Sequence, residues 1–146
     1  MAQEMMDDRP HIRFELLQAG DEEGLRDYMR VRVTESALVE SCGQCFYIPK
    51  GFICDAASTP RAVWAMYPPI GPWTEGAIAH DLLYLEGCCS RATADNVFYD
   101  LMLRCNVVKR TRKIMYYAVR VGGWKVWRRY RKLEEYAERY EETQAV

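Results

Sequence analysis

The sequence predicts an α+β protein, in which a small N-terminal antiparallel β-sheet is followed by a C-terminal part of four to five helices. Up to about residue 55, apolar and polar residues alternate, which is typical of strands with one buried face. From about residue 56 the apolar residues recur at helical spacing, and Ser, Thr, Pro and Gly stand where helices begin and end. A chain of 146 residues, 49% of them hydrophobic and with a net charge of −1, can bury one core.

The whole chain, residues 1–146, is expected to form a single domain. Residues 1–10 are acidic and rich in Met, and we expect a flexible lead-in there. Residues 11–55 are β-rich, residues 56–140 are helical, and residues 141–146 form a frayed tail. No apolar run approaches the roughly 20 residues of a membrane span, and the first residues lack the basic and apolar regions of a signal peptide. We therefore expect a cytosolic protein.

Three strands are predicted in the β-rich part. Residues 12–16 alternate as a strand with one buried face does, and a second strand covers residues 28–33. After a polar connector, a third strand lies near residues 45–55. Pro49-Lys50-Gly51 interrupts this third strand, so we expect it to bend or bulge there and to lie at a sheet edge.

The helical part begins with caps at short intervals. A short helix is predicted from Pro60 through Met66, since Pro is favoured at the first helical position. After a proline-rich loop, Thr74 is expected to cap the next helix and Gly87 to end it. Ser90 should cap a third helix, whose buried face is the apolar series Ala94, Val97, Phe98, Leu101, Met102 and Cys105.

A long helix is predicted from Lys109 to about Tyr130, with a kink at Gly122-Gly123. Further residues at helical spacing continue to Tyr140. The side chains expected to face the core from the long helix are Ile114, Tyr117, Ala118 and Val121.

The helix predicted over residues 74–85 sorts its side chains by chemistry. One stripe is apolar and consists of Ile78, Leu82 and Leu85; the adjacent stripe carries His80, Asp81 and Tyr84. An imidazole can relay a proton near neutral pH, and a carboxylate can hold a cation or orient the ring. The pair fits general-base or metal chemistry. It equally fits a buried polar group satisfied by structural hydrogen bonds.

Six cysteines, at positions 42, 45, 54, 88, 89 and 105, require a choice between disulfides, metal ligands and free thiols. Cys42-Gly43-Gln44-Cys45 has the spacing of a zinc knuckle, and Cys88-Cys89 could complete a set of four sulfurs. Adjacent cysteines rarely ligate one structural zinc, however, and a cytosolic chain argues against disulfides. We expect reduced thiols without metal.

Basic residues are concentrated in the long helix, where residues 109–132 carry ten Lys or Arg and no acid. The candidate binding residues are Lys109, Arg110, Arg112, Lys113, Arg128, Arg129, Arg131 and Lys132. Tyr and Trp residues lie between them, so the segment could bind nucleic-acid phosphates, an anionic membrane surface or an acidic protein partner. We expect the acidic protein ahead of DNA. The alternative is an ordinary solvated face, balanced by the acidic first 60 residues.

Three ordered motifs resemble a family of small tailed-phage and prophage proteins of unknown function. They are Gly51-Phe52-Ile53-Cys54-Asp55-Ala56-Ala57-Ser58-Thr59-Pro60-Arg61, His80-Asp81-Leu82-Leu83-Tyr84 and Arg91-Ala92-Thr93-Ala94-Asp95-Asn96-Val97-Phe98. The resemblance implies a bacteriophage protein with a virion-associated structural or assembly accessory role. Its partners would be other phage structural proteins, and it would be found in the host cytoplasm or in the virion.

A more distant likeness is to phospholipases A2 of the viral capsid type, which carry H-D-x-x-Y on one helix and an Asp on the next. It implies a calcium-assisted hydrolase of lipids or esters, with His80 as the base, Asp95 orienting it, Tyr84 bonded to Asp95, and Asp81 ligating calcium. The glycine-rich calcium loop and the paired disulfides of those enzymes are absent; Asp55 would replace part of the site. Without this activity no cofactor is expected, and His80, Tyr84, Asp95 and Asp55 would lock the helices together. Both interpretations require these four residues to converge.

Overall fold

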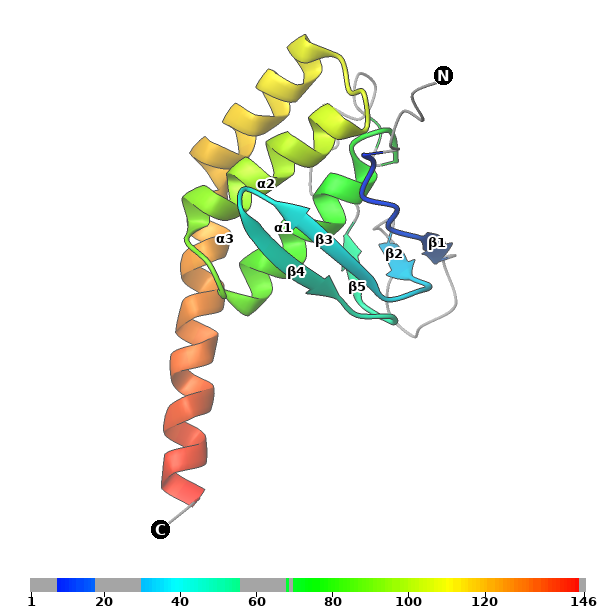
Figure 1. Cartoon of the computed structure of the whole chain (residues 1–146). Helices are drawn as coiled ribbons and strands as arrows, with labels where there is room; N and C mark the ends of the chain where they lie inside the picture. The colour runs from blue at the N-terminus through cyan, green and yellow to red at the C-terminus, as the bar shows by residue number, and fades with distance from the viewer. Residues whose placement is uncertain (1–7, 18–29, 56–67, 69, 145–146) are drawn as a thin grey trace.

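The computed structural model describes residues 8–17, 30–55, 68 and 70–144, and its architecture is α+β, as predicted (Figure 1). Strands occupy the first part of the chain and helices the rest. The strands are β1 (Phe14–Leu17), β2 (Arg30–Val33), β3 (Ala37–Ser41), β4 (Gln44–Ile48) and β5 (Ile53–Asp55); the helices are α1 (Thr74–Glu86), α2 (Arg91–Arg104) and α3 (Lys109–Gln144).

The strands form two antiparallel sheets instead of one, with the orders β1-β2-β5 and β3-β4. The predicted polar connector contains a strand, β3, which pairs with β4 through the two-residue turn Cys42-Gly43. Both turn residues have positive φ, 52° and 73°, which suits the right-handed twist of a hairpin. The predicted third strand is divided at Pro49-Lys50-Gly51: its first part is β4, and its second part, β5, lies at the edge of the other sheet.

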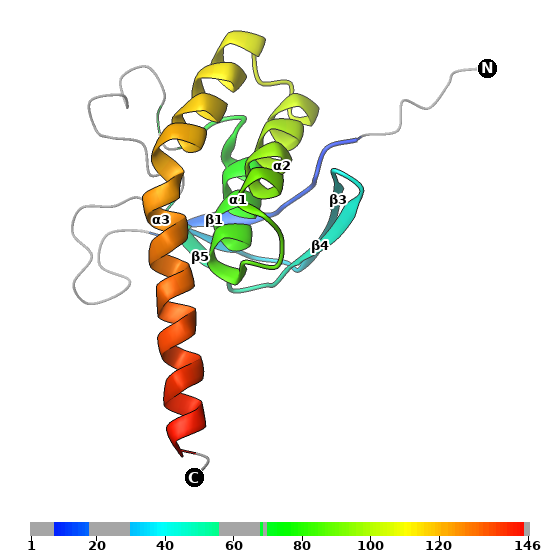
Figure 2. The ribbon, with the colours of Figure 1, turned by 90° about the vertical axis from the view of Figure 1, so that its left-hand side faces the viewer.

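The described residues contain three helices, so the prediction of four or five is wrong for this part of the chain. The short helix predicted over 60–66 falls outside the described residues. The segment after Tyr130 does not form a separate helix but continues α3, because neither Pro nor Gly follows Gly123 to end it. In both views the yellow beginning of α3 is inclined to its orange and red remainder, and the red end extends away from the rest of the fold (Figures 1 and 2).

The caps of α1 and α2 position the two motif helices close together. Gly87 ends α1 with a φ of 62°, and the Ser90 hydroxyl accepts the Thr93 N–H at the start of α2, both as predicted. The N-cap of α1 is Trp73, however, and Thr74 is the first residue of the helix. The Thr74 hydroxyl instead accepts the Gly71 N–H at 2.9 Å, so it shapes the loop that leads into the helix.

The core lies between the two sheets and the inner faces of the helices. From the sheets it takes Val31, Val33, Val39, Phe46 and Ile48, and from α1 and α2 it takes Ile78, Leu82, Leu83, Val97 and Leu101. A second cluster at the other end of α1 and α2 joins Trp73, Ala77, Phe98, Met102, Val107 and Met115. The predicted stripes of α1 and α2 are therefore largely correct, although Leu85 is exposed.

The face of α3 that packs on the core is not the predicted one. Ile114, Tyr117, Ala118 and Val121 are all exposed, whereas Gly123 is buried. A β-carbon on Gly123 would lie 2.5 Å from the Tyr84 hydroxyl oxygen, so only glycine lets α3 approach α1 this closely. The observed contact face is a second apolar series around Gly123, formed by Met115, Val119, Trp127 and Tyr130. Helical spacing alone did not distinguish this series from the exposed one. Among the described residues, no helix is apolar enough over its length to cross a bilayer.

Candidate functional site

Asp95 is the centre of a polar network between the helices. It lies on α2 with no exposed surface, and one carboxylate oxygen, Oδ1, accepts two hydrogen bonds from α1. The Tyr84 hydroxyl donates at 2.6 Å, and His80 Nε2 lies 2.9 Å away. Because an ionised carboxylate only accepts, Nε2 carries the proton in this arrangement. His80, Tyr84 and Asp95 thus converge as predicted.

The second oxygen of Asp95 is held by two arginines that were not predicted as residues of this site. Arg120 on α3 donates to Oδ2 at 2.7 Å, and Arg91 at the start of α2 lies 3.3 Å away. Arg91 also donates to the backbone carbonyl of Arg120 at 3.1 Å. Its spacing of four residues before Asp95 was a usable signal, whereas nothing in the sequence connects Arg120 to Asp95. One carboxylate therefore binds side chains from all three helices.

The other ring nitrogen of His80, Nδ1, faces the next residue along the helix. It lies 3.6 Å from Oδ1 of Asp81, whose side chain is partly exposed. The imidazole itself is only 6% exposed, and it packs against the rings of Tyr84 and Phe98 at centroid distances of 4.1 and 5.2 Å. His80 is thus fixed on one side by Asp95 and faces a second carboxylate on the other.

The network shifts pKa values so that His80 and Asp95 favour their charged forms and Tyr84 its neutral form. Burial alone would lower the pKa of His80, but the carboxylates of Asp81 and Asp95 outweigh it and raise that pKa above 6.5. Burial would raise the pKa of Asp95, and the hydrogen bonds from His80, Tyr84 and Arg120 instead hold it below 3.8. Burial and the adjacent Asp95 both raise the pKa of Tyr84, so it remains a phenol that donates its proton.

These shifts predict how stability depends on pH. The proton on His80 stabilises the fold fully below pH 6.5, and this contribution is lost as the pH rises through the higher folded-state pKa. The charge on Asp95 stabilises the fold above pH 3.8 and is lost as the pH falls through the lower folded-state pKa. Denaturant unfolding at a series of pH values should show a plateau between these limits. In His80→Gln the alkaline decline should flatten; an unchanged decline would contradict this assignment.

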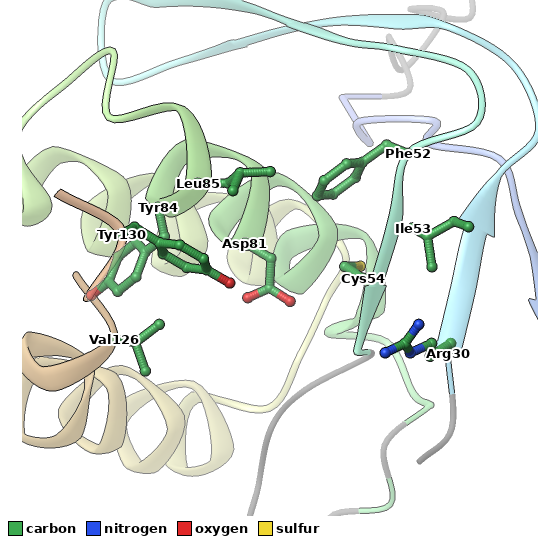
Figure 3. Close-up of a pocket in the computed structure, with 9 residues that line it drawn as sticks. All are labelled: Arg30, Phe52, Ile53, Cys54, Asp81, Tyr84, Leu85, Val126 and Tyr130. Carbon is green, nitrogen blue, oxygen red and sulfur yellow. The ribbon is translucent and has the colours of Figure 1, made fainter. Parts of the chain in front are cut away.

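A cavity of about 260 Å³ lies beside the network, bounded by β2, β5, α1 and α3. Figure 3 shows Asp81 among its lining residues, with Tyr84 and Tyr130 on one side and Cys54 and Arg30 on the other. Tyr84 lines the cavity and also donates to the buried Asp95. His80 is not part of the lining, so Asp81 and Tyr84 are the members of the network that connect it to the cavity.

The described residues do not by themselves make a calcium site. Asp81 lines the cavity, but nowhere in the described part of the chain do three or more His, Cys, Asp or Glu side chains gather as metal ligands. The backbone of Asp55 pairs with Arg30 at the end of β5, while its side chain lies outside what the structure describes. The expected convergence of Asp55 with His80 therefore stays a prediction.

The candidate basic residues of α3 divide into two groups. Arg112 and Arg131 are turned toward the fold: Arg112 donates to the Val107 carbonyl at 2.8 Å, and Arg131 to the carbonyls of Tyr84 and Leu85, both at 2.8 Å. The others are exposed: Lys109, Arg110, Lys113, Arg128, Arg129 and Lys132. The exposed group is the part of the segment that a partner can reach.

None of the six cysteines, which all lie in the described part of the chain, forms a disulfide. Cys42 and Cys45 are exposed at the turn between β3 and β4, and Cys88 is exposed between α1 and α2. Burial, with a contribution from Cys88, raises the pKa of Cys89 to about 11. Cys89 is therefore a weakly reactive thiol at neutral pH.

The fold and the network define a small α+β protein in which the described helices α1, α2 and α3 meet at one buried carboxylate. A family model described as "Protein of unknown function (DUF1353)" matches residues 31–119, more than half of the chain. The chain belongs to this family. The matched part contains α1 and α2, and hence His80, Tyr84 and Asp95, and it ends just before Arg120. Comparisons with curated proteins and with solved structures found no match.

Proposed function

We propose that this protein is a structural or assembly accessory protein of a tailed phage or prophage, and that the network around Asp95 is a lock between its helices. The lock holds α3 in place as an arm whose exposed cations bind an anionic partner. Other phage structural proteins would be its neighbours, in the host cytoplasm or in the virion.

This proposal is supported by the number of hydrogen bonds that the Asp95 carboxylate accepts. Its two oxygens accept from four side chains on three helices, two of them arginines. In a catalytic dyad the carboxylate pairs mainly with the imidazole, whereas here the same carboxylate also pairs with two guanidinium groups. An anion buried in this way costs several kcal/mol unless it is fully paired. Full pairing on all sides is typical of a structural contact.

The phage assignment is tested by mass spectrometry of purified particles from a phage or induced prophage that encodes this chain. We expect peptides of the protein at a constant copy number per particle if it stays in the virion. If it acts only in assembly, it should be present in immature particles and absent from mature ones. Absence from every particle, together with unchanged particle yield after gene deletion, would contradict the accessory role.

The orientation of His80 favours a second candidate, a hydrolase. Asp95 and Tyr84 fix the ring so that Nε2 carries the proton, and in the neutral ring Nδ1 then holds the lone pair. Nδ1 faces Asp81, which lines the cavity. A water beside Asp81 could lose its proton to Nδ1 as it attacks an ester or phospholipid. The calcium expected for such chemistry would bind Asp81, with Asp55 as the second proposed ligand.

Hydrolysis assays on phospholipid and ester substrates separate the two candidates. For a hydrolase, His80→Ala should lower the rate by about 10²–10⁴-fold, the usual contribution of a general base. Asp81→Asn, at a partly exposed position, should lower the rate while leaving the fold intact, and Asp100→Asn on α2 is the matched control. If the clean wild-type protein turns over none of these substrates, with or without added calcium, the hydrolase is excluded and the lock remains.

A further inference from the structure

The outward face of α3 carries an exposed apolar patch. The patch consists of Ile114, Tyr117, Val121 and Trp124, which are 42%, 62%, 74% and 44% exposed. Their spacing of three, four and three residues places them in one line along the helix. They lie opposite the buried Gly123, on the side turned away from α1. We call these four residues the outer patch.

Cations surround the outer patch at its ends and along its flanks. Arg110 precedes it and Arg128 follows it on the same line, while Lys113 and Lys125 lie at its sides, and all four are exposed. The Lys125 ammonium and the Arg128 guanidinium lie 5.7 and 5.9 Å from the ring of Trp124. No acidic residue occurs between positions 109 and 132. A partner must therefore be apolar where it meets the patch and anionic around it.

Three other occupants fit this surface poorly. A second copy of the chain would bring like charges together along the patch. Nucleic-acid phosphates would be pressed against four apolar side chains. An acidic protein would find a patch spanning only eleven residues, about 15 Å of one helix, whereas stable protein interfaces bury roughly 800 Å² per partner.

We propose that the outer patch docks on the surface of an anionic lipid bilayer, with α3 lying along the interface. Trp and Tyr prefer the boundary between headgroups and acyl chains, and the surrounding Lys and Arg side chains can reach upward to anionic headgroups from apolar stems. This inference rests on the proposed role of α3 as the binding arm and names the surface that it binds. It replaces the acidic protein expected from the sequence, because three of the four exposed patch residues, Ile114, Tyr117 and Val121, were expected in the core.

The test is co-sedimentation of the full chain with vesicles, read together with Trp fluorescence. Binding is expected to vesicles of equal parts phosphatidylcholine and phosphatidylglycerol, with a blue shift in emission, and not to phosphatidylcholine alone. Raising the salt should weaken binding, since screening shortens to a few ångströms at about 1 M. The double variant Arg128→Gln with Lys125→Gln should bind about tenfold or more weakly, given roughly fivefold per basic residue.

Two further variants separate insertion of the patch from charge alone. Val121→Gln with Trp124→Gln should weaken vesicle binding by at least tenfold and leave the melting temperature unchanged, because both residues are exposed. The matched control is Leu38→Gln with Leu103→Gln, at positions that are 71% and 48% exposed outside α3, and it should bind as wild type does. No binding to the anionic vesicles, equal weakening by the control, or tighter binding to a DNA duplex would overturn the proposal. The proposed role of Asp95 as a lock between the helices is tested separately, by measuring the unfolding of Asp95→Asn.

Discussion

Asp95→Asn is expected to lower the free energy of unfolding by about 3–5 kcal/mol, the usual cost of removing one partner from a buried ion pair. The substitution keeps the size of the side chain and removes the charge that two arginines and an imidazole share. Arg91 and Arg120 are 23% and 32% exposed and can turn partly to water, so the lower end of this range is expected. Denaturant unfolding followed by circular dichroism measures the change.

Asp100→Asn is the matched control for this variant, on the same helix and with the same chemical change. Asp100 accepts from the Ser41 hydroxyl at 2.7 Å, and its carboxylate lies 3.6 Å from Arg104 with its side chain 36% exposed. Exposed pairs of this kind contribute about 0–1 kcal/mol. If the two variants lose equal stability, Asp95 has no special role as a lock.

Replacing each of two adjacent glycines in α3 by alanine is expected to change the stability of the protein in opposite directions. At Gly122 an added β-carbon meets nothing within 4 Å, so Gly122→Ala should stabilise the helix by about 0.5–1 kcal/mol. At Gly123 it would lie 2.5 Å from the Tyr84 hydroxyl oxygen. Gly123→Ala should therefore destabilise the fold by about 1–3 kcal/mol, because α3 must move away from α1 or Tyr84 must leave Asp95.

The same unfolding measurement checks both glycine variants. The double variant Gly123→Ala with Tyr84→Phe keeps the ring and removes the hydroxyl, and part of the loss should be relieved if the clash lies at that oxygen. A stabilising Gly123→Ala would show that α3 does not approach Tyr84 as closely as the structure has it.

The candidate site was predictable where its residues share a helix or follow a known motif. His80 and Tyr84 are one turn apart, and the later Asp95 came from the likeness to an H-D-x-x-Y enzyme. Arg120 was not predictable, because it lies 25 residues from Asp95 and meets it only when α3 folds back across α2. The spacing of residues within a helix indicates which side chains share a face. It does not indicate which face another helix will cover.

Secondary-structure elements were predicted correctly where local backbone hydrogen bonding determines them. They were missed where contacts between distant segments determine them. Ser90 and Gly87 mark helix ends because caps satisfy local backbone groups. β3 was taken for a polar connector, since its alternation is short and its partner is supplied by the Cys42-Gly43 turn. The buried face of α3 was misassigned because the helix carries two apolar series. Met115, Val119 and Trp127 pack on the fold around Gly123, and the predicted series stays exposed.

The proposal that His80 and Asp95 lock α1 to α2 is tested by the pKa of His80, measured by NMR. The chain has two histidines, so the signal of His80 is identified by its disappearance in His80→Gln. His80 is expected to titrate above pH 6.5, the ordinary value for His, with Nε2 still protonated and hydrogen-bonded after Nδ1 loses its proton. Titration at or below pH 6.5, or a neutral ring protonated at Nδ1, would contradict the lock between His80 and Asp95.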